Sequence, residues 1–183
     1  MQFILKLLKN IIDAVGSLCS IVMILMVLNV FYDVVSRYFF NDVSIGMQEL
    51  EWHLFAAMFM FGIGYTLKED GHVRVDVFYD NLSEHSQAII NLFGSIFFAL
   101  PITALILYFG WDYAHEAFQM GEGSPDPGGL PYRWIVRSII PFSSIFLLLC
   151  ILYVTLNNFC HMIWLWAKSH NINTNFLHFF PVR

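Results

Sequence analysis

Four long apolar runs cross this chain of 183 residues, and none of them contains an Asp, Glu, Lys or Arg. The runs cover residues 15–32, 54–67, 89–111 and 138–166. A bilayer core of about 30 Å needs about 20 helical residues, and tilt and flanking residues absorb small differences. The composition is 58% hydrophobic and 13% charged, whereas soluble domains are about 25% charged. We therefore predict an all-α integral membrane protein with four transmembrane helices.

The polar stretches between the runs are too short to form a further domain of ordinary size. We predict one membrane domain over residues 1–183, with transmembrane helices at about 11–38, 45–67, 87–111 and 132–166. The connecting segments are a loop over 68–86, a Gly/Pro-rich loop over 112–131 and a tail over 167–183.

The residues before the first predicted span also have helical periodicity. Apolar side chains recur at helical spacing opposite Lys6 and Lys9. This pattern predicts either an interfacial helical segment in the headgroup layer or an ordinary positively charged flank. The apolar residues concerned are Phe3, Ile4, Leu7, Leu8 and Ile11.

The positions of Lys and Arg predict that both termini are cytoplasmic, because positively charged loops tend to stay on that side. In this orientation six of the nine basic residues are cytoplasmic and three are outside. The six are Lys6, Lys9, Lys68, Arg74, Lys168 and Arg183, and the three are Arg37, Arg133 and Arg137. The formal net charge of −5 gives no indication of nucleic-acid binding.

The charge-free runs restrict the possible functions. Transporters and pumps usually keep a few ionisable groups at mid-membrane depth, because ions, protons or charged substrates need them there. The runs keep none, so we expect the chain not to perform a central transport or redox step by itself. The sequence has no G-x-x-x-x-G-K-[ST] loop and no nucleophile–base pattern, and its three cysteines have no metal-binding or redox spacing. We predict neither enzymatic activity nor a cofactor.

Charged residues gather instead at the predicted outer ends of the helices. Asp33 and Arg37 are four residues apart on one helix, a spacing that favours an ion pair. Ser44 is the predicted N-cap of the second helix, and Pro131 the predicted first residue of the fourth. The outer cluster is interpreted as an ion-pair network that holds helix ends, as a docking surface for a partner, or as both. Its candidate residues are Asp33, Arg37, Glu49, Glu51, His53, Asp112, Glu116, Asp126, Arg133 and Arg137.

On the inner side, residues 72–77 alternate strictly between polar residues and valine. A period of two predicts a short extended segment with one apolar face. Its polar residues His72, Arg74 and Asp76 are the candidate inner-rim contacts with a partner.

Two other functions remain as alternatives. Seven histidines in a four-helix membrane chain raise the possibility of a haem-bearing anchor subunit of a respiratory complex. Only His53 and His115 are expected at one depth, and haem ligation needs two imidazoles that face one plane inside the bundle. A small transporter that works alone is the other alternative.

Four segments outside generic hydrophobic sequence occur in a fixed order between residues 37 and 141. They are Arg-Tyr-Phe-Phe-Asn at 37–41, Ser-Ile-Gly-Met-Gln-Glu-Leu-Glu-Trp-His-Leu-Phe at 44–55, Asp-Gly-His-Val-Arg-Val-Asp-Val at 70–77 and Gly-Glu-Gly-Ser-Pro-Asp-Pro-Gly-Gly-Leu-Pro-Tyr-Arg-Trp at 121–134. Together they resemble the small membrane subunit (DctQ-like) of tripartite ATP-independent periplasmic (TRAP) transporters. The forms at 48–53 and 124–131 resemble the branch associated with mannitol, chloroaromatic and 2-oxo or hydroxy acid substrates. Many family members have Trp-x-Glu-Glu where this chain has Met-Gln-Glu-Leu-Glu at 47–51, which weakens any general role for a paired Glu-Glu.

The resemblance implies a multi-pass protein of the bacterial inner membrane with four helices and cytoplasmic termini, so that the loop over 112–131 is periplasmic. It also implies two protein partners beside membrane lipids: a large membrane subunit that carries substrate and sodium, and a periplasmic binding protein that delivers an organic acid. The small subunit of such a family is expected to brace the fixed part of an elevator-type carrier and to help seat the binding protein. It is expected to have no substrate, metal or cofactor site of its own.

Overall fold

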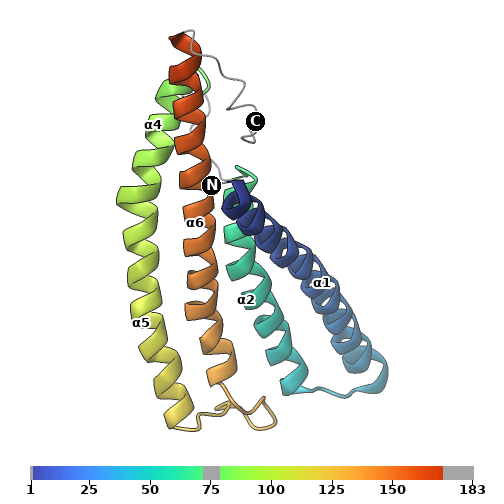
Figure 1. Ribbon diagram of the computed structural model, residues 1–183. Coiled ribbons are helices and arrows are strands. Elements are labelled where there is room, and N and C mark those ends of the chain that lie inside the picture. Colours follow the sequence, from blue (N-terminus) through green and yellow to red (C-terminus); the bar gives the residue numbers. More distant parts are fainter. Residues whose placement is uncertain (1, 72–78, 171–183) are drawn as a thin grey trace.

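The computed structural model describes residues 2–71 and 79–170, and the regular elements in these residues are all helical. In chain order they are α1 (Gln2–Phe40), α2 (Ile45–Lys68), α4 (Glu84–Gly94), the π-helical η1 (Ser95–Ala99), α5 (Leu100–Gln119) and α6 (Trp134–Ser169). Helices α4, η1 and α5 follow one another without a break and form one rod (Figure 1). The described residues thus form the four long helical units that the sequence predicts. The expected extended segment at 72–77 and the tail after residue 170 lie outside the described residues.

Three of the four units are long and apolar enough to cross a membrane, namely Phe3–Phe40, Glu84–Gln119 and Trp134–Lys168. The fourth unit, α2, has 24 residues. At 1.5 Å per residue it measures about 36 Å, which is long enough to cross. It is less apolar than the others, and α1 and α6 pack on two sides of it (Figure 1). Because its neighbours cover it, less of its surface has to face lipid.

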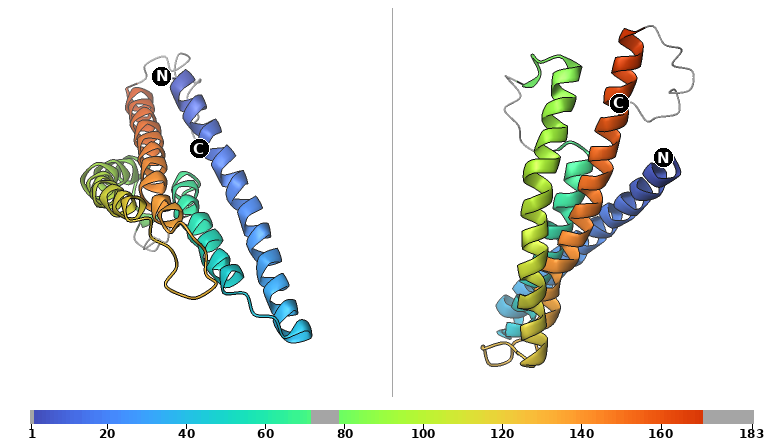
Figure 2. Two further views of the ribbon diagram at one scale, coloured as in Figure 1. Left: turned by 90° about the horizontal axis from the view of Figure 1, so that it is seen from below. Right: turned by 60° about the vertical axis from the view of Figure 1, so that its left-hand side comes forward.

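Helix α6 is the centre of the arrangement. Helix α2 packs on one side of it and the α4–η1–α5 rod on the other (Figure 1). Helix α1 packs along α2, touches α6 near its own beginning, and diverges from α6 along its second half (Figure 2). The connections at 41–44 and 120–133 lie at one end of the molecule, here called the loop end. The beginning of α1 and the end of α6 lie toward the other, here called the terminal end (Figure 1).

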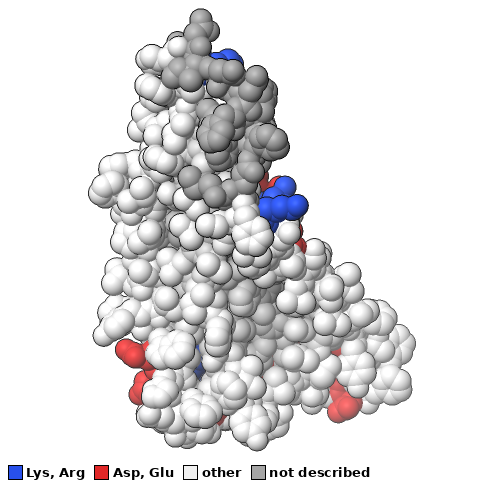
Figure 3. All heavy atoms as spheres, viewed as in Figure 1, with Lys and Arg blue, Asp and Glu red and all other residues white. Residues whose placement is uncertain are grey.

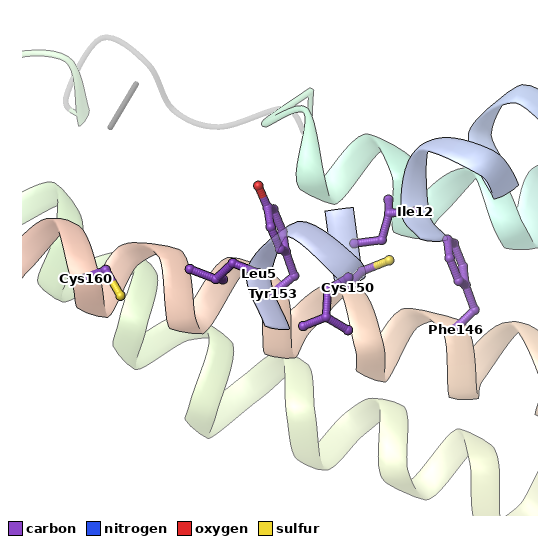
Figure 4. Packing of buried hydrophobic residues seen from close by; sticks show 7 residues of the cluster. Leu5, Ile12, Phe146, Cys150, Tyr153 and Cys160 are labelled. Carbon is purple, nitrogen blue, oxygen red and sulfur yellow. The ribbon is translucent and has the colours of Figure 1, made fainter. Parts of the chain in front are cut away.

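The apolar core lies around the middle of α6, where the first turns of α1 cross α2 and α6. Leu5, Leu8 and Ile12 of α1 pack in one cluster with residues of α6 that include Phe146 and Cys150 (Figure 4). Each of these five residues is at most 8% exposed. The first turns of α1 therefore belong to the packed bundle.

The buried face of α1 differs from the apolar face that the periodicity of residues 3–11 predicts. Leu8 is buried, but the other residues of the predicted apolar face are exposed. The buried face is instead Leu5, Leu8 and Ile12, at spacing i, i+3, i+7, which is also one face of a helix. The outward members are Phe3, Ile4, Leu7 and Ile11.

Glycines allow the helices to approach closely at three interfaces. A Cβ on Gly16 would lie 2.3 Å from the Tyr65 ring, one on Gly64 would lie 2.7 Å from the Phe146 ring, and one on Gly110 would lie 2.7 Å from a methyl group of Ile140. Small residues are the usual means of helix association in lipid, where the hydrophobic effect does not drive helices together. These contacts fix α1 on α2, α2 on α6 and α5 on α6.

Two predictions about helix starts have different outcomes. The N-cap at Ser44 is confirmed, because its hydroxyl oxygen accepts a hydrogen bond from the Met47 N–H at 3.4 Å. The prediction that Pro131 opens the last helix is wrong, since α6 begins at Trp134. Tyr132 has a φ of 65°, in the left-handed region, and this interrupts a helical path between Pro131 and Trp134.

Candidate functional site

The loop over residues 120–133, between α5 and α6, is folded onto itself by backbone hydrogen bonds. The Ser124 N–H donates to the Leu130 carbonyl at 3.1 Å, and the Arg133 N–H donates to the Glu122 carbonyl at 2.9 Å. Gly128 has a φ of 85°, a conformation that glycine adopts at little cost. The loop thereby presents residues 125–128 as an exposed tip.

Glu49 of α2 fastens this loop to the bundle. Its carboxylate accepts hydrogen bonds from the Ser124 hydroxyl and, at 2.6 Å, from the Leu130 N–H. The fit is close, because a Cβ on Gly129 would lie 2.8 Å from the Glu49 carboxylate and 2.3 Å from Ser124 Oγ. Hydrogen bonds to a charged acceptor are about twice as strong as neutral ones. Glu49 therefore fixes the position of the loop on α2.

Glu122 fastens the other side of the loop to α6. Its carboxylate lies 2.6 Å from an Arg137 guanidinium nitrogen and 3.7 Å from one of Arg133. The Arg137 guanidinium also lies 4.1 Å from the centre of the Tyr113 ring on α5, within cation–π distance. With its side chain 19% exposed against 42% for Arg133, Arg137 is the more deeply held of the two arginines.

Glu122 was not predicted from the sequence as a partner of these arginines. Its position in a Gly-Glu-Gly loop gives no helical spacing from which a pair could be inferred. The only feature of the sequence that links Glu122 to an arginine is that Glu122 and Arg133 lie in the same motif, at 121–134.

A second group of polar residues joins α1 to the beginning of α2. Asp33 is 4% exposed and forms the expected ion pair with Arg37. One turn earlier, Asn29 is 7% exposed and donates from its side-chain amide to the Met47 carbonyl at 2.9 Å. Asn29 lies inside an apolar run and was also missed, although it continues the four-residue spacing of Asp33 and Arg37.

The remaining acidic candidates form no ion pair with a described residue. Asp112, Glu116 and Asp126 are exposed, and Glu51 is half-buried. The loop end is therefore acidic: it carries eight Asp or Glu and three Arg, and acidic side chains gather there on the face in Figure 3. The eight acids are Asp33, Asp42, Glu49, Glu51, Asp112, Glu116, Glu122 and Asp126.

The structure gives no support to the haem alternative. His53 lies on α2 and His115 on α5, and α6 lies between these helices (Figure 1). Their imidazoles consequently do not share one space inside the bundle. Within residues 2–71 and 79–170, no three His, Cys, Asp or Glu side chains come together as a metal-binding group.

The terminal end has a smaller ionic group that the sequence did not reveal. Lys68, at the end of α2, contacts Asp13 of α1 at 2.6 Å and also pairs with Glu69. The two helices cross at this point, and residues 55 positions apart meet only because of that crossing. The predicted inner-rim residues His72, Arg74 and Asp76 lie outside the described residues.

These features define a class: a multi-pass α-helical membrane protein whose charged groups hold helix ends and loops, while the long apolar runs within its helices are free of charge. Residues 26–161 match the family described as tripartite ATP-independent periplasmic transporters, DctQ component. The chain is also 28% identical over 113 residues to the sialic acid TRAP transporter small permease protein SiaQ of Vibrio cholerae serotype O1. That match covers 61% of this chain and 65% of the relative, just under two thirds of its length.

The chain belongs to the DctQ family of small TRAP transporter subunits. It is accordingly a multi-pass protein of the bacterial inner membrane and a transport component, not an enzyme. The family match includes Asn29, Asp33, Glu49, the whole 120–133 loop and Arg137, and thus the polar contacts of the loop end. The family resemblance of the sequence motifs is confirmed, and the substrate branch stays a prediction.

Proposed function

We propose that the chain is the small membrane subunit of a sodium-coupled, binding-protein-dependent secondary transporter that imports organic acids. In this role it braces a large carrier subunit and helps to dock the periplasmic binding protein, without a substrate site of its own. Family membership supports the small-subunit role. In the predicted orientation, with cytoplasmic termini, the loop end faces the periplasm, where a binding protein would approach.

The fixed loop is the observation that carries the docking role. Glu49 and Glu122 hold both sides of the 120–133 loop, while its tip remains exposed. A loop that is already ordered loses little conformational entropy when a partner binds. The acidic excess at this end favours a partner that presents basic side chains, since charge complementarity speeds encounter and fixes register.

The bracing role is supported by how the bundle is built. Close contacts at Gly16, Gly64 and Gly110 join neighbouring helices, and polar groups tie α1 to α2 at both ends. The outward faces of α1 and α5 are apolar over most of their length. Such faces suit lipid or the apolar helices of a large subunit. The charge-free apolar runs leave ion coupling to that subunit.

The docking role can be tested by charge reversal in the complete transporter. We expect Glu49→Lys or Arg133→Glu to lower substrate uptake into proteoliposomes, because each disturbs the loop, while the isolated binding protein keeps its substrate affinity. Lys6→Glu, at the terminal end, is the control and is expected to leave uptake unchanged. Co-purification of the large subunit separates failed assembly from failed docking. Undiminished uptake with the reversed residues would refute the docking role, and uptake by this chain alone would support a self-sufficient transporter.

A further inference from the structure

A cavity of about 620 Å³ lies at the terminal end, far from the loop contacts. Its lining comes from the beginning of α1, the end of α2, helix α4 and the second half of α6. The volume is within the range of about 300–1,000 Å³ typical of sites for small molecules.

The lining contains hydrogen-bond donors that the described residues do not satisfy. Lys9 and Lys168 form no ion pair with any described residue, and both are exposed. The half-buried side-chain amides of Asn157 and Asn158 likewise form no hydrogen bond within the described part of the chain. Lys68 also lines the cavity but is already paired with acidic residues. The hydrogen-bond donors that remain available to a ligand are therefore two ammonium groups and two side-chain amides.

Aromatic residues in the lining favour a position of this cavity near the lipid headgroups. On α6 the rings of His161 and Trp164 are stacked with centroids 6.1 Å apart, and Lys168 Nζ lies 4.9 Å from the centre of the Trp164 ring. All three residues line the cavity. Trp side chains concentrate at the membrane–water interface, so a ligand can enter from the bilayer.

We propose that the cavity binds the phosphodiester headgroup of a membrane phospholipid. A phosphodiester has one negative charge shared by two free oxygens, which can accept hydrogen bonds from ammonium and amide groups together. The lining has three lysines and three carboxylates, the latter being Glu69, Asp70 and Glu84. Its positive charge for a ligand therefore comes from Lys9 and Lys168, which form no ion pair with a described residue. Cationic side chains in pockets between membrane helices are known to bind such headgroups. Glu84 of α4, also in the lining, offers an acceptor for the hydroxyl or ammonium group that most phospholipids carry beyond the phosphate. A bound lipid would link Lys9 of α1 to Lys168 of α6.

The first test measures lipid retention by native mass spectrometry on the full-length protein, co-purified with its large subunit if it assembles with one. Each lysine near an anionic headgroup contributes roughly five-fold to binding, so Lys9→Gln with Lys168→Gln should weaken phosphatidylglycerol retention about 30-fold. Lys6→Gln, which removes an exposed lysine of α1 outside the lining, is the matched control and should retain lipid like the wild type. Equal retention in all three proteins would overturn the proposal.

The second test identifies the source of the phosphate. We expect phosphatidylglycerol to raise the melting temperature of the wild type, and diacylglycerol with the same acyl chains and inorganic phosphate each to have no such effect. Asn158→Asp, which is nearly isosteric but places a negative charge in the lining, should abolish the increase. Equal stabilisation by inorganic phosphate would assign the cavity to a free anion, and equal stabilisation by diacylglycerol would assign it to acyl-chain packing; either result overturns the proposal.

Discussion

The loop end and the packed region of this helical bundle are held together by different forces. At the loop end, carboxylates and arginines hold a loop and a helix end through individual hydrogen bonds and ion pairs. One example is the hydrogen bond from the Leu130 N–H to Glu49. In the packed region, where α1 crosses α2 and α6, apolar side chains such as Ile12 and Phe146 interlock over a broad contact. An end that must expose its backbone to water and partners cannot rely on burial, so directional polar contacts set its shape. Substitutions at the loop end should therefore act locally, and substitutions in the packed region should affect the whole bundle.

The largest effect is expected in the packed region. Gly64→Leu places a side chain where even a Cβ would meet Phe146 and Cys150. We expect a loss of about 2–3 kcal/mol, the usual cost of overpacking, measured by thermal unfolding in detergent. Gly62→Leu is the control, since a Cβ there meets nothing within 4 Å. Equal losses in the two variants would show that α2 and α6 do not pack as described.

The second effect concerns the buried acid on α1. Arg37→Ala leaves Asp33, which is 4% exposed, without its cation, and should cost about 2 kcal/mol. Adding Asp33→Asn should recover part of that loss, because a neutral amide is cheaper to bury than a carboxylate. A double-mutant cycle on the two positions measures their coupling. Strictly additive losses would contradict the ion pair.

The two arginines of α6 should differ although they share one carboxylate. Arg137→Gln should cost about 1.5 kcal/mol, because it removes a charged hydrogen bond at 2.6 Å and a contact with the Tyr113 ring. Arg133→Gln should cost less than about 0.5 kcal/mol, as expected for a looser, exposed pair. Chemical denaturation of the two variants side by side checks the order, and the reverse order would be incompatible with the geometry of Glu122.

The smallest change in global stability is expected from Gly129→Ala, with a clear local effect. The added methyl group displaces Ser124 and the Glu49 carboxylate, so the Leu130 amide should exchange hydrogen faster and the loop should be cut faster by protease. Gly123→Ala is the matched control in the same loop, since its Cβ would meet nothing within 4 Å. If the Leu130 amide exchanges hydrogen at the same rate in both variants, Glu49 does not hold the loop.

Local features could be predicted from the sequence because they depend on neighbours along the chain. The long apolar runs indicate four membrane helices, the four-residue spacing of Asp33 and Arg37 indicates their ion pair, and Ser44 has the properties of an N-cap. The motifs around the loop are specific enough to indicate the DctQ component from the sequence alone.

What could not be predicted depends on how distant segments meet. Lys68 finds Asp13 only because α1 crosses α2, and Glu122 finds Arg137 only through the path of a loop. The buried face of α1 was also hidden. A helix that packs on one side and meets lipid on the other is apolar all round, so hydrophobic periodicity does not distinguish Leu5 and Ile12 from the outward Ile4 and Leu7.

The proposed docking role requires that the loop end, and not the terminal end, receives the periplasmic binding protein. The most direct test is the affinity of that binding protein for the assembled transporter in nanodiscs, with Asp126→Lys at the exposed tip compared with Lys6→Glu at the terminal end. Because Asp126 makes no ion pair with a described residue, its reversal leaves the internal contacts of the loop intact. We predict weaker binding for Asp126→Lys and wild-type binding for Lys6→Glu. Unchanged binding with Asp126→Lys, or a loss confined to Lys6→Glu, would contradict the docking role.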